Sequence, residues 1–215
     1  MAVLRVVGGD LALNLVNTVE PRLEGQVPER DHLDSPTALL AWAERVGLVD
    51  ALSREQVSEA WAREPGAAAA ALEDVQQLRE AVGTAVDAAR THLTDATTDL
   101  ALQSVLQRAA AALTRSILTL DVEGQRPVRS AIGTQPATLL ADRLAIAALD
   151  LLQTADLHRL KSCPPEHGGC GWVFLDTSKN GSRRWCSMDD CGTHAKSRRL
   201  TQRRRDSRSK VHTPT

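Results

Sequence analysis

The four cysteines of this 215-residue chain all lie in one 29-residue window near its C-terminus. Six residues separate Cys163 from Cys170, fifteen separate Cys170 from Cys186, and four separate Cys186 from Cys191. Two pairs of thiols joined by an arm of this length are typical of a tetrahedral zinc site with four thiolate ligands. Since every thiol of the chain is gathered here, we expect a structural Zn²⁺ site rather than two disulfides or four buried thiols.

Two histidines lie inside or beside this window, and either could replace one cysteine ligand. Sites of three cysteines and one histidine are common, so His167 and His194 are alternative ligands. The all-cysteine set is the better hypothesis because it uses every thiol in the chain. A catalytic zinc ion needs an open coordination position and usually has fewer thiolates, which favours a structural ion. A redox-sensitive zinc site is a further alternative, because thiolates oxidise.

The residues between the cysteines predict a small, treble-clef-like zinc finger. Three glycines flank the second cysteine and let the backbone turn sharply there. Trp172–Leu175 has the pattern of a strand, Asn180-Gly181 is a type I′ turn signal, and residues 184–186 would form the returning strand. A helix over residues 192–205 would begin at the last cysteine. We therefore expect a zinc finger with a C-terminal helix at 161–206, followed by a disordered tail at 207–215.

The part of the chain before the window, residues 1–160, predicts a mainly α-helical body. The whole chain has only four Trp, one Phe and no Tyr, so Ala, Leu and Val must form the core. Apolar residues recur at spacings of three and four, which predicts helices at 11–19, 37–46, 53–61, 67–93, 100–113 and 137–160. Residues 117–122, a turn at 123–125 and residues 126–132 predict one small β-hairpin.

Polar residues in front of these segments predict where the helices begin. Asp10 and Ser35 are expected N-caps, and Ser53 is expected to cap the third helix in a capping box. Thr98 or Asp99 is expected to cap the fifth helix, and residues 134–136 to open the last one.

Charge is distributed unevenly along the chain. Residues 1–160 carry 14 basic and 22 acidic side chains, whereas residues 161–215 carry 12 basic and 5 acidic ones. Residues 196–205 hold six basic side chains and no acid, and on a helix Lys196, Arg199 and Arg203 would share one face. Such a surface is typical of binding to nucleic-acid phosphates. The predicted nucleic-acid-binding residues are Arg183, Arg184, His194, Lys196, Arg198, Arg199, Arg203, Arg204 and Arg205. A solvated basic tail and an RNA-binding surface are the alternatives.

The helical body offers one candidate for a small-ligand pocket. On a helix that follows Gly8-Gly9, Asp10, Asn14 and Asn17 would form a polar stripe that could line a pocket with Trp42. The alternative is that these side chains cap the backbone and fix the start of the helix. No nucleotide-binding loop and no Ser/His/Asp pattern is recognisable, so we do not expect an enzyme. The chain also has no apolar run near 18 residues and no signal-peptide pattern, so we expect a cytoplasmic protein without a membrane span.

Two stretches of the sequence resemble a known pair of domains. Residues 170–192, CGWVFLDTSKNGSRRWCSMDDCG, resemble the CGNR zinc finger. Residues 9–18, GDLALNLVNT, and 34–42, DSPTALLAW, resemble the ABATE domain that usually accompanies it. The resemblance covers nearly the whole chain, and it implies a zinc-binding, stress-induced transcription regulator that contacts DNA. The family's C-G-N-R-A-K is Cys-Gly-Thr-His-Ala-Lys here, at 191–196, so His194 replaces an arginine.

These observations support three hypotheses for the function. The first is a DNA-binding transcription regulator, whose body binds a small-molecule effector or forms a homodimer. The second is a zinc-stabilised module that binds protein or RNA without sensing a ligand. The third, an enzyme with an active site on the polar N-terminal face, has the least support in the sequence.

Overall fold

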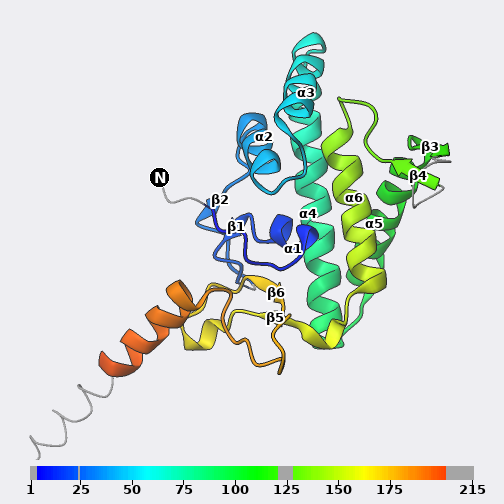
Figure 1. The fold of residues 1–215 in the computed structure, drawn as a ribbon. Coiled ribbons are helices and arrows are strands. Elements are labelled where there is room, and N and C mark those ends of the chain that lie inside the picture. The colour runs from blue at the N-terminus through cyan, green and yellow to red at the C-terminus, as the bar shows by residue number, and fades with distance from the viewer. Residues whose placement is uncertain (1–3, 24, 121–127, 202–215) are drawn as a thin grey trace, which may run out of the picture.

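The structure is a computed structural model that describes residues 4–23, 25–120 and 128–201. Figure 1 shows a helical body with the cysteine-containing segment below it and, at its side, the two-stranded sheet of β3 (Ile117–Leu120) and β4 (Val128–Ala131). The three sheets of the described residues each have two antiparallel strands. The prediction of a mainly α-helical fold with a small β-hairpin and clustered C-terminal cysteines is confirmed, although a second two-stranded sheet in the body, Val19–Glu20 with Arg30–Asp31, was not predicted.

The centre of the body is a layer of three long helices, α4 (Ala67–Thr91), α5 (Ala96–Thr114) and α6 (Leu139–Thr154). They pack against one another, with α1 (Leu11–Val16) lying across α4 and α6. The core is aliphatic, as the scarcity of aromatic residues predicts, and Leu78, Val82 and Leu144 are fully buried in it. The predicted helix over 67–93 is confirmed almost to the residue.

Helix α1 is shorter than the predicted segment 11–19. Asp10 caps its start as predicted, and accepts a hydrogen bond from the Ala12 N–H at 2.7 Å. The helix ends at Val16, and Val19–Glu20 forms strand β1, which pairs with β2 (Arg30–Asp31). The periodic pattern therefore continues three residues beyond the true end of the helix, because Val19 is buried from a strand instead.

Two of the predicted helix caps are wrong. Ser35 does cap α2 (Pro36–Arg45), but α3 (Ala51–Arg63) begins at Asp50, whose carboxylate accepts the Ser53 N–H. Helix α5 likewise begins at Asp95 rather than at Thr98 or Asp99. In both cases an aspartate three residues earlier binds the backbone N–H of the predicted cap, because its carboxylate oxygen reaches the N3 position.

The last predicted helix, 137–160, is too long at both ends, since α6 begins at Leu139 after Thr138 and is not opened by residues 134–136. Helix α6 ends at Thr154, and the chain continues through a short 3₁₀ turn, η1 (Leu157–Arg159), into strand β5 (Leu160–Ser162). Strand β5 pairs with β6 (Val173–Leu175). The predicted pairing of residues 172–175 with 184–186 is therefore wrong, since the partner strand lies before the first cysteine. The predicted β-hairpin in the body is confirmed as β3 (Ile117–Leu120) and β4 (Val128–Ala131).

A buried arginine fixes the N-terminal part of the chain onto α4. The Arg79 side chain is 6% exposed and donates two hydrogen bonds of 2.8 Å to the Asp31 carboxylate. It also donates to the Thr18 hydroxyl at 3.2 Å. This guanidinium therefore joins Thr18, just before β1, and Asp31, in β2, to helix α4.

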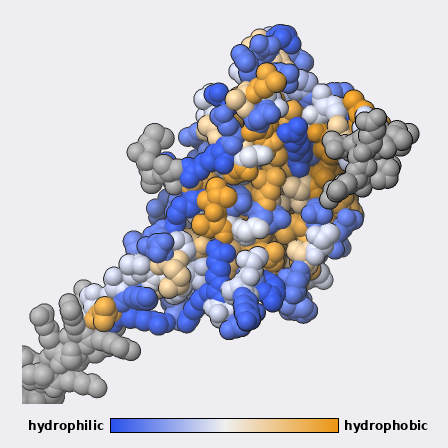
Figure 2. Space-filling model, viewed as in Figure 1, coloured by the Kyte–Doolittle hydropathy of each residue, from blue (hydrophilic) through white to orange (hydrophobic). Residues whose placement is uncertain are grey.

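A helix over residues 193–201 projects from the lower left of the molecule in Figure 1. Hydrophobic side chains gather over the helical body, whereas the surface of the projecting helix is mainly hydrophilic (Figure 2). The predicted helix was 192–205, and its last residues lie outside the described part, as does the predicted disordered tail 207–215. Within the described residues, no helix combines the length and apolar character that a membrane span requires.

We predict that Leu144→Ala lowers the free energy of unfolding by about 2–5 kcal/mol, because it leaves a cavity in the layer of long helices. Leu106→Ala is the matched control, since the Leu106 side chain is 55% exposed on α5. Urea unfolding of the two variants measures the difference. Equal losses would contradict the placement of Leu144 at the centre of the core.

Candidate metal centre

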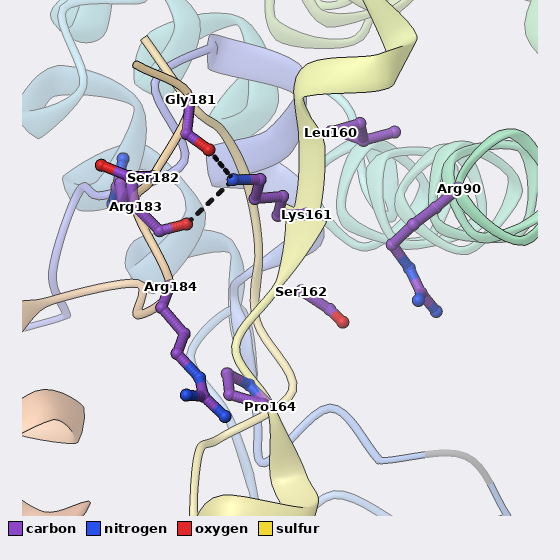
Figure 3. A pocket seen from close by; sticks show the side chains of 9 residues that line it. All are labelled: Arg90, Leu160, Lys161, Ser162, Pro164, Gly181, Ser182, Arg183 and Arg184. Atoms are coloured by element: carbon purple, nitrogen blue, oxygen red, sulfur yellow. Dashed lines mark hydrogen bonds between the residues drawn. The ribbon is translucent and has the colours of Figure 1, made fainter. Parts of the chain in front are cut away.

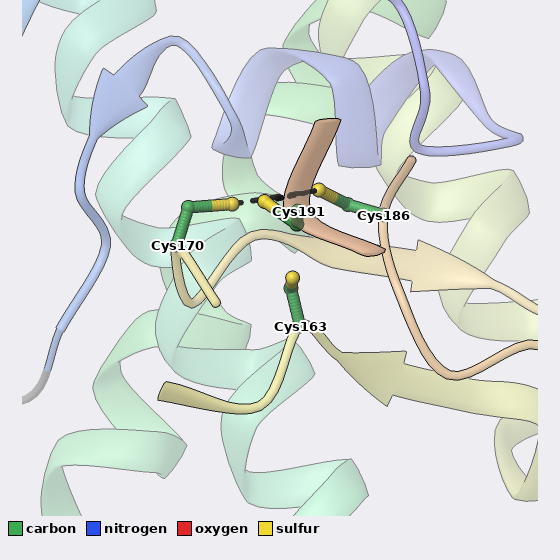
Figure 4. A group of neighbouring side chains, drawn as sticks. All are labelled: Cys163, Cys170, Cys186 and Cys191. Carbon is green, nitrogen blue, oxygen red and sulfur yellow. Dashed lines mark hydrogen bonds between the residues drawn. The ribbon is translucent and has the colours of Figure 1, made fainter. Parts of the chain in front are cut away.

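The four cysteine sulfurs converge on one point between the body and the projecting helix. All four lie within 4.8 Å of one another, and no two cysteines form a disulfide. The Cys170 and Cys186 sulfurs are 3.5 Å apart, and the Cys186 and Cys191 sulfurs are 3.6 Å apart. A tetrahedral zinc ion with bonds of about 2.3 Å requires sulfurs about 3.8 Å apart. The side chains point toward one another in Figure 4, so their geometry fits one tetrahedral Zn²⁺ ion.

The β5–β6 hairpin positions the first two ligands. Cys163 follows β5 directly, and its N–H donates to the Trp172 carbonyl at 2.8 Å. The connection from Cys163 to Cys170 then folds back tightly, with a positive φ of 85° at Gly168. A Cβ atom on Gly169 would lie 2.7 Å from the Cys163 sulfur. Position 169 therefore has no room for a side chain, and the backbone at position 168 adopts a conformation that favours glycine. Both agree with the glycine pattern around Cys170.

The second pair of ligands comes from an irregular segment and a helix start. Residues 184–186 form no strand, and Cys191 lies in a turn of π-helix, Met188–Gly192, which leads into helix 193–201. The turn before this segment runs from Ser178 to Gly181, and the Gly181 N–H donates to the Ser178 carbonyl at 3.1 Å. Only Gly181 has a positive φ in this turn, so the predicted type I′ turn, which needs two such residues, is wrong.

The electrostatics of the cluster favour a bound cation. Hydrogen bonds with Cys170 and the other two thiols lower the pKa of Cys163, whereas hydrogen bonds with Cys163 and the other two thiols raise the pKa of Cys170. The opposite directions arise because closely packed thiols cannot all ionise beside one another. A divalent cation removes this conflict by stabilising every thiolate at once. The donor set therefore fits Zn²⁺, which supplies the cross-link on which such a small unit depends.

Neither histidine of the region lies among the sulfurs. His167 lies beside the Glu166 carboxylate at 3.0 Å and the Arg184 guanidinium at 2.9 Å. The His194 ring is 3.6 Å from the Asp190 carboxylate and 71% exposed. Within the described residues, the group of side chains able to bind a metal consists of cysteines alone. This geometry favours the all-cysteine ligand set over a set with one histidine.

A buried carboxylate organises the segment between the two ligand pairs, and sequence reasoning missed it. Asp176 is fully buried and accepts hydrogen bonds from the Lys161 ammonium at 2.6 Å and the Ser178 hydroxyl at 2.6 Å. Its other bonds come from the backbone N–H groups of Ser178 and Arg183. The bonds from Lys161 and Ser178 hold the pKa of Asp176 well below its ordinary value. The Asp-x-Ser spacing is an Asx-turn signal that could have identified this residue.

The body contributes directly to the zinc unit through Asn17. The Asn17 amide donates to the Val173 carbonyl at 2.8 Å and accepts from the Val173 N–H at 2.9 Å. Next to this pair, the Trp172 indole N–H donates to the Val19 carbonyl at 2.8 Å, and the Arg22 N–H donates to the Cys170 carbonyl at 3.0 Å. Residues 17–22 therefore border β6 on its free edge, where a second strand of the finger was expected.

The residues predicted to line a ligand pocket make backbone and core contacts instead. Asp10 caps α1, and the Asn14 side chain accepts the Gly8 N–H at 2.8 Å. Asn17 binds Val173, and Trp42 is buried in the core. Burial raises the pKa of Asp10, against the hydrogen bonds from Ala12 and Leu13 that lower it. These contacts favour the alternative reading of the polar stripe, in which it fixes the start of α1.

The structure has a basic cleft of about 490 Å³ between the end of α4 and the zinc unit (Figure 3). None of the predicted pocket residues lines it. The ammonium of Lys161, one of the lining residues, donates to the Gly181 and Arg183 carbonyls as well as to Asp176. The three N–H donors of the Lys161 ammonium thus have three acceptors within the protein. The lining residues are Arg90, Leu160, Lys161, Ser162, Pro164, Gly181, Ser182, Arg183 and Arg184.

The predicted nucleic-acid-binding residues separate into an internal and an external group. Arg183 lies over the Phe174 ring at 4.3 Å and donates to the Val7, Trp185 and Cys186 carbonyls, so it holds the finger together. Exposed positions are occupied by Arg184, His194, Lys196, Arg198 and Arg199. Arg203, Arg204 and Arg205 lie outside the described residues.

We predict that the purified protein binds one Zn²⁺ ion per chain and that Cys→Ser at 163, 170, 186 or 191 abolishes stoichiometric binding. His167→Ala and His194→Ala are the controls, and they retain the metal because neither ring lies near the sulfurs. Elemental analysis after dialysis against a weak chelator measures the zinc content. Loss of zinc from either histidine variant would contradict the all-cysteine set.

We also predict that Asn17→Ala lowers the free energy of unfolding by about 2–4 kcal/mol, because both backbone groups of buried Val173 lose their partner. Asn180→Ala, at an exposed turn position, is the matched control. Thermal or urea unfolding of the zinc-loaded proteins tests the difference. An Asn17→Ala protein as stable as the control would show that the two hydrogen bonds do not join the body to the finger.

Comparison with known proteins agrees with this architecture. Residues 159–204 match the family model of the CGNR zinc finger, and residues 9–155 match that of ABATE, described as "Putative stress-induced transcription regulator". A search of curated proteins finds no match. The ABATE match covers more than half of the chain, and the four clustered cysteines are those of the zinc finger. The chain therefore belongs to the ABATE family and carries a zinc-binding CGNR finger at its C-terminal end.

Proposed function

We propose that the protein is a transcription regulator that binds duplex DNA through its zinc finger. The observation that carries this proposal is the projecting helix 193–201, which begins two residues after the last zinc ligand and presents exposed basic side chains. A helix free on most of its surface is able to approach a nucleic-acid groove without moving the body.

The inner side of this helix attaches it to the finger. Ala195 is buried and packs in the cluster that contains Trp185 and Cys191. Lys196, Arg198 and Arg199 are exposed. Because Ala195 and Cys191 anchor the first turn, the zinc ion fixes the direction in which the basic residues point.

Electrostatics support a polyanionic partner. The region from residue 161 onward has a net positive charge and the body a net negative one. An acidic body disfavours non-specific wrapping of DNA and leaves the basic end as the attractive surface. The C-G-N-R motif of the finger family has arginine where this chain has His194. The His194 ring lies 3.6 Å from the Asp190 carboxylate. We therefore expect its phosphate contacts to be weaker at this position.

We also propose that the body has a regulatory role and that the protein acts in the cytoplasm. An effector molecule or a second copy of the chain acting on the ABATE region would change how the finger meets DNA. The family description, a stress-induced transcription regulator, supports such a role, and it supports regulation rather than catalysis.

We predict that the zinc-loaded protein binds a mixed-sequence DNA duplex at 50 mM salt and loses most of this affinity at 200 mM. Replacing Lys196 and Arg199 with Ala reduces the slope of log affinity against log salt by about two, since each contributes about one phosphate contact. Replacing Arg54 and Arg63 on α3 with Ala is the control. Fluorescence anisotropy measures both series.

Two outcomes would contradict the proposal. Absence of duplex binding at 50 mM salt would exclude DNA as the partner of the isolated protein. Tighter binding to single-stranded or double-stranded RNA of the same length would instead support the alternative of an RNA-interaction module.

A further inference from the structure

Residues 4–8 precede both regions that match the families, yet they pack against the zinc finger. Leu4 and Val7 contact the buried cluster of the finger. The Val7 carbonyl accepts from the Arg183 guanidinium at 2.8 Å, and the Gly8 carbonyl accepts from the Leu175 N–H at 2.8 Å. This N-terminal segment is therefore part of the metal-binding unit, although more than 150 residues separate it from the cysteines.

Within this segment, Arg5 contacts one residue near each pair of zinc ligands. Its guanidinium lies over the Trp172 ring, 5.2 Å from the ring centre, and Trp172 is two residues beyond Cys170. It also forms an ion pair with Asp190, the residue before Cys191. The Arg5 side chain is only 30% exposed, so its charge is partly shielded from solvent.

The zinc site has a charge imbalance that such a cation would relieve. A zinc ion with four thiolates carries two net negative charges, and Asp190 adds another nearby. Cys163, Cys186 and Cys191 are buried, which makes uncompensated charge costly. Burial alone lowers the pKa of Arg5, but the charges of Asp190, Cys186 and Cys191 outweigh it and keep this pKa above its ordinary value.

Several other cations close to the site have partners of their own or are exposed. Arg184 lies over the Trp185 ring and beside the His167 ring, and Arg198 is exposed on the projecting helix. Lys161 is bound by Asp176 and two carbonyls, and Arg183 holds the Cys186 carbonyl and the Phe174 ring. We propose that Arg5 is the charge-balancing residue of the zinc site, a positioning residue outside the ligand set that raises the affinity of the four cysteines for Zn²⁺.

The test measures zinc affinity of the full chain by competition with a chelating dye. Arg5→Gln should weaken zinc binding about tenfold, the usual size of an effect from a residue beyond the ligands. Arg5→Lys, which keeps the charge, should retain more affinity than Arg5→Gln. Arg63→Gln is the control, because the Arg63 side chain is 74% exposed on α3 and pairs with Glu59, far from the cysteines in sequence.

Two further measurements separate charge from shape. Adding Asp190→Asn to Arg5→Gln should recover part of the affinity, since it removes the negative charge that Arg5 balanced. The absorption spectrum of the Co²⁺-substituted Arg5→Gln protein should match that of the unaltered protein, because all four sulfurs remain in place. Zinc affinity of Arg5→Gln within twofold of the control would overturn the proposal, and so would a changed cobalt spectrum without recovery by Asp190→Asn.

Discussion

The paired hydrogen bonds between the Asn17 carboxamide and Val173 join the two parts of this protein. A carboxamide offers an N–H donor and a carbonyl acceptor side by side in the same plane, so it can replace the neighbouring strand that β6 lacks on this edge. Two further contacts between these parts of the protein involve residues just before β6. The Trp172 indole N–H donates to the Val19 carbonyl, and the Cys170 carbonyl accepts from the Arg22 N–H. The ABATE region thereby acts as a structural part of the zinc finger.

The cysteine pattern and the helical periodicity predicted the metal, the fold class and the long helix α4, because these features depend on local spacing. The errors arose where the outcome depends on residues far away in sequence. Leu160 continues the apolar pattern of α6, but it is buried in β5 because Leu175 lies opposite to it. The cap errors are a local exception, because Asp50 and Asp95 begin their helices three residues before Ser53 and Thr98 and bind the backbone N–H groups of these two residues.

The basic residues show why charge alone does not identify a binding surface. Arg183 and Arg184 are neighbours in sequence, and both were predicted to contact nucleic acid. Arg183 instead binds three backbone carbonyls and the Phe174 ring inside the finger, whereas Arg184 is exposed. No property of the sequence distinguishes them without the position of Phe174. The polar stripe of Asn14 and Asn17 is a similar case, since both carboxamides bind backbone groups.

The close approach of Arg22 to Gly171 has a consequence for how such proteins evolve. A Cβ atom at Gly171 would lie 1.8 Å from the Arg22 carbonyl oxygen, so the two regions are fitted to each other at the level of the bare backbone. Gene recombination that moved residues 159–204 behind an unrelated body would remove the partners of Trp172, Val173 and Cys170 at once. The finger and the ABATE region are therefore expected to be inherited together, as one unit of selection rather than as interchangeable modules.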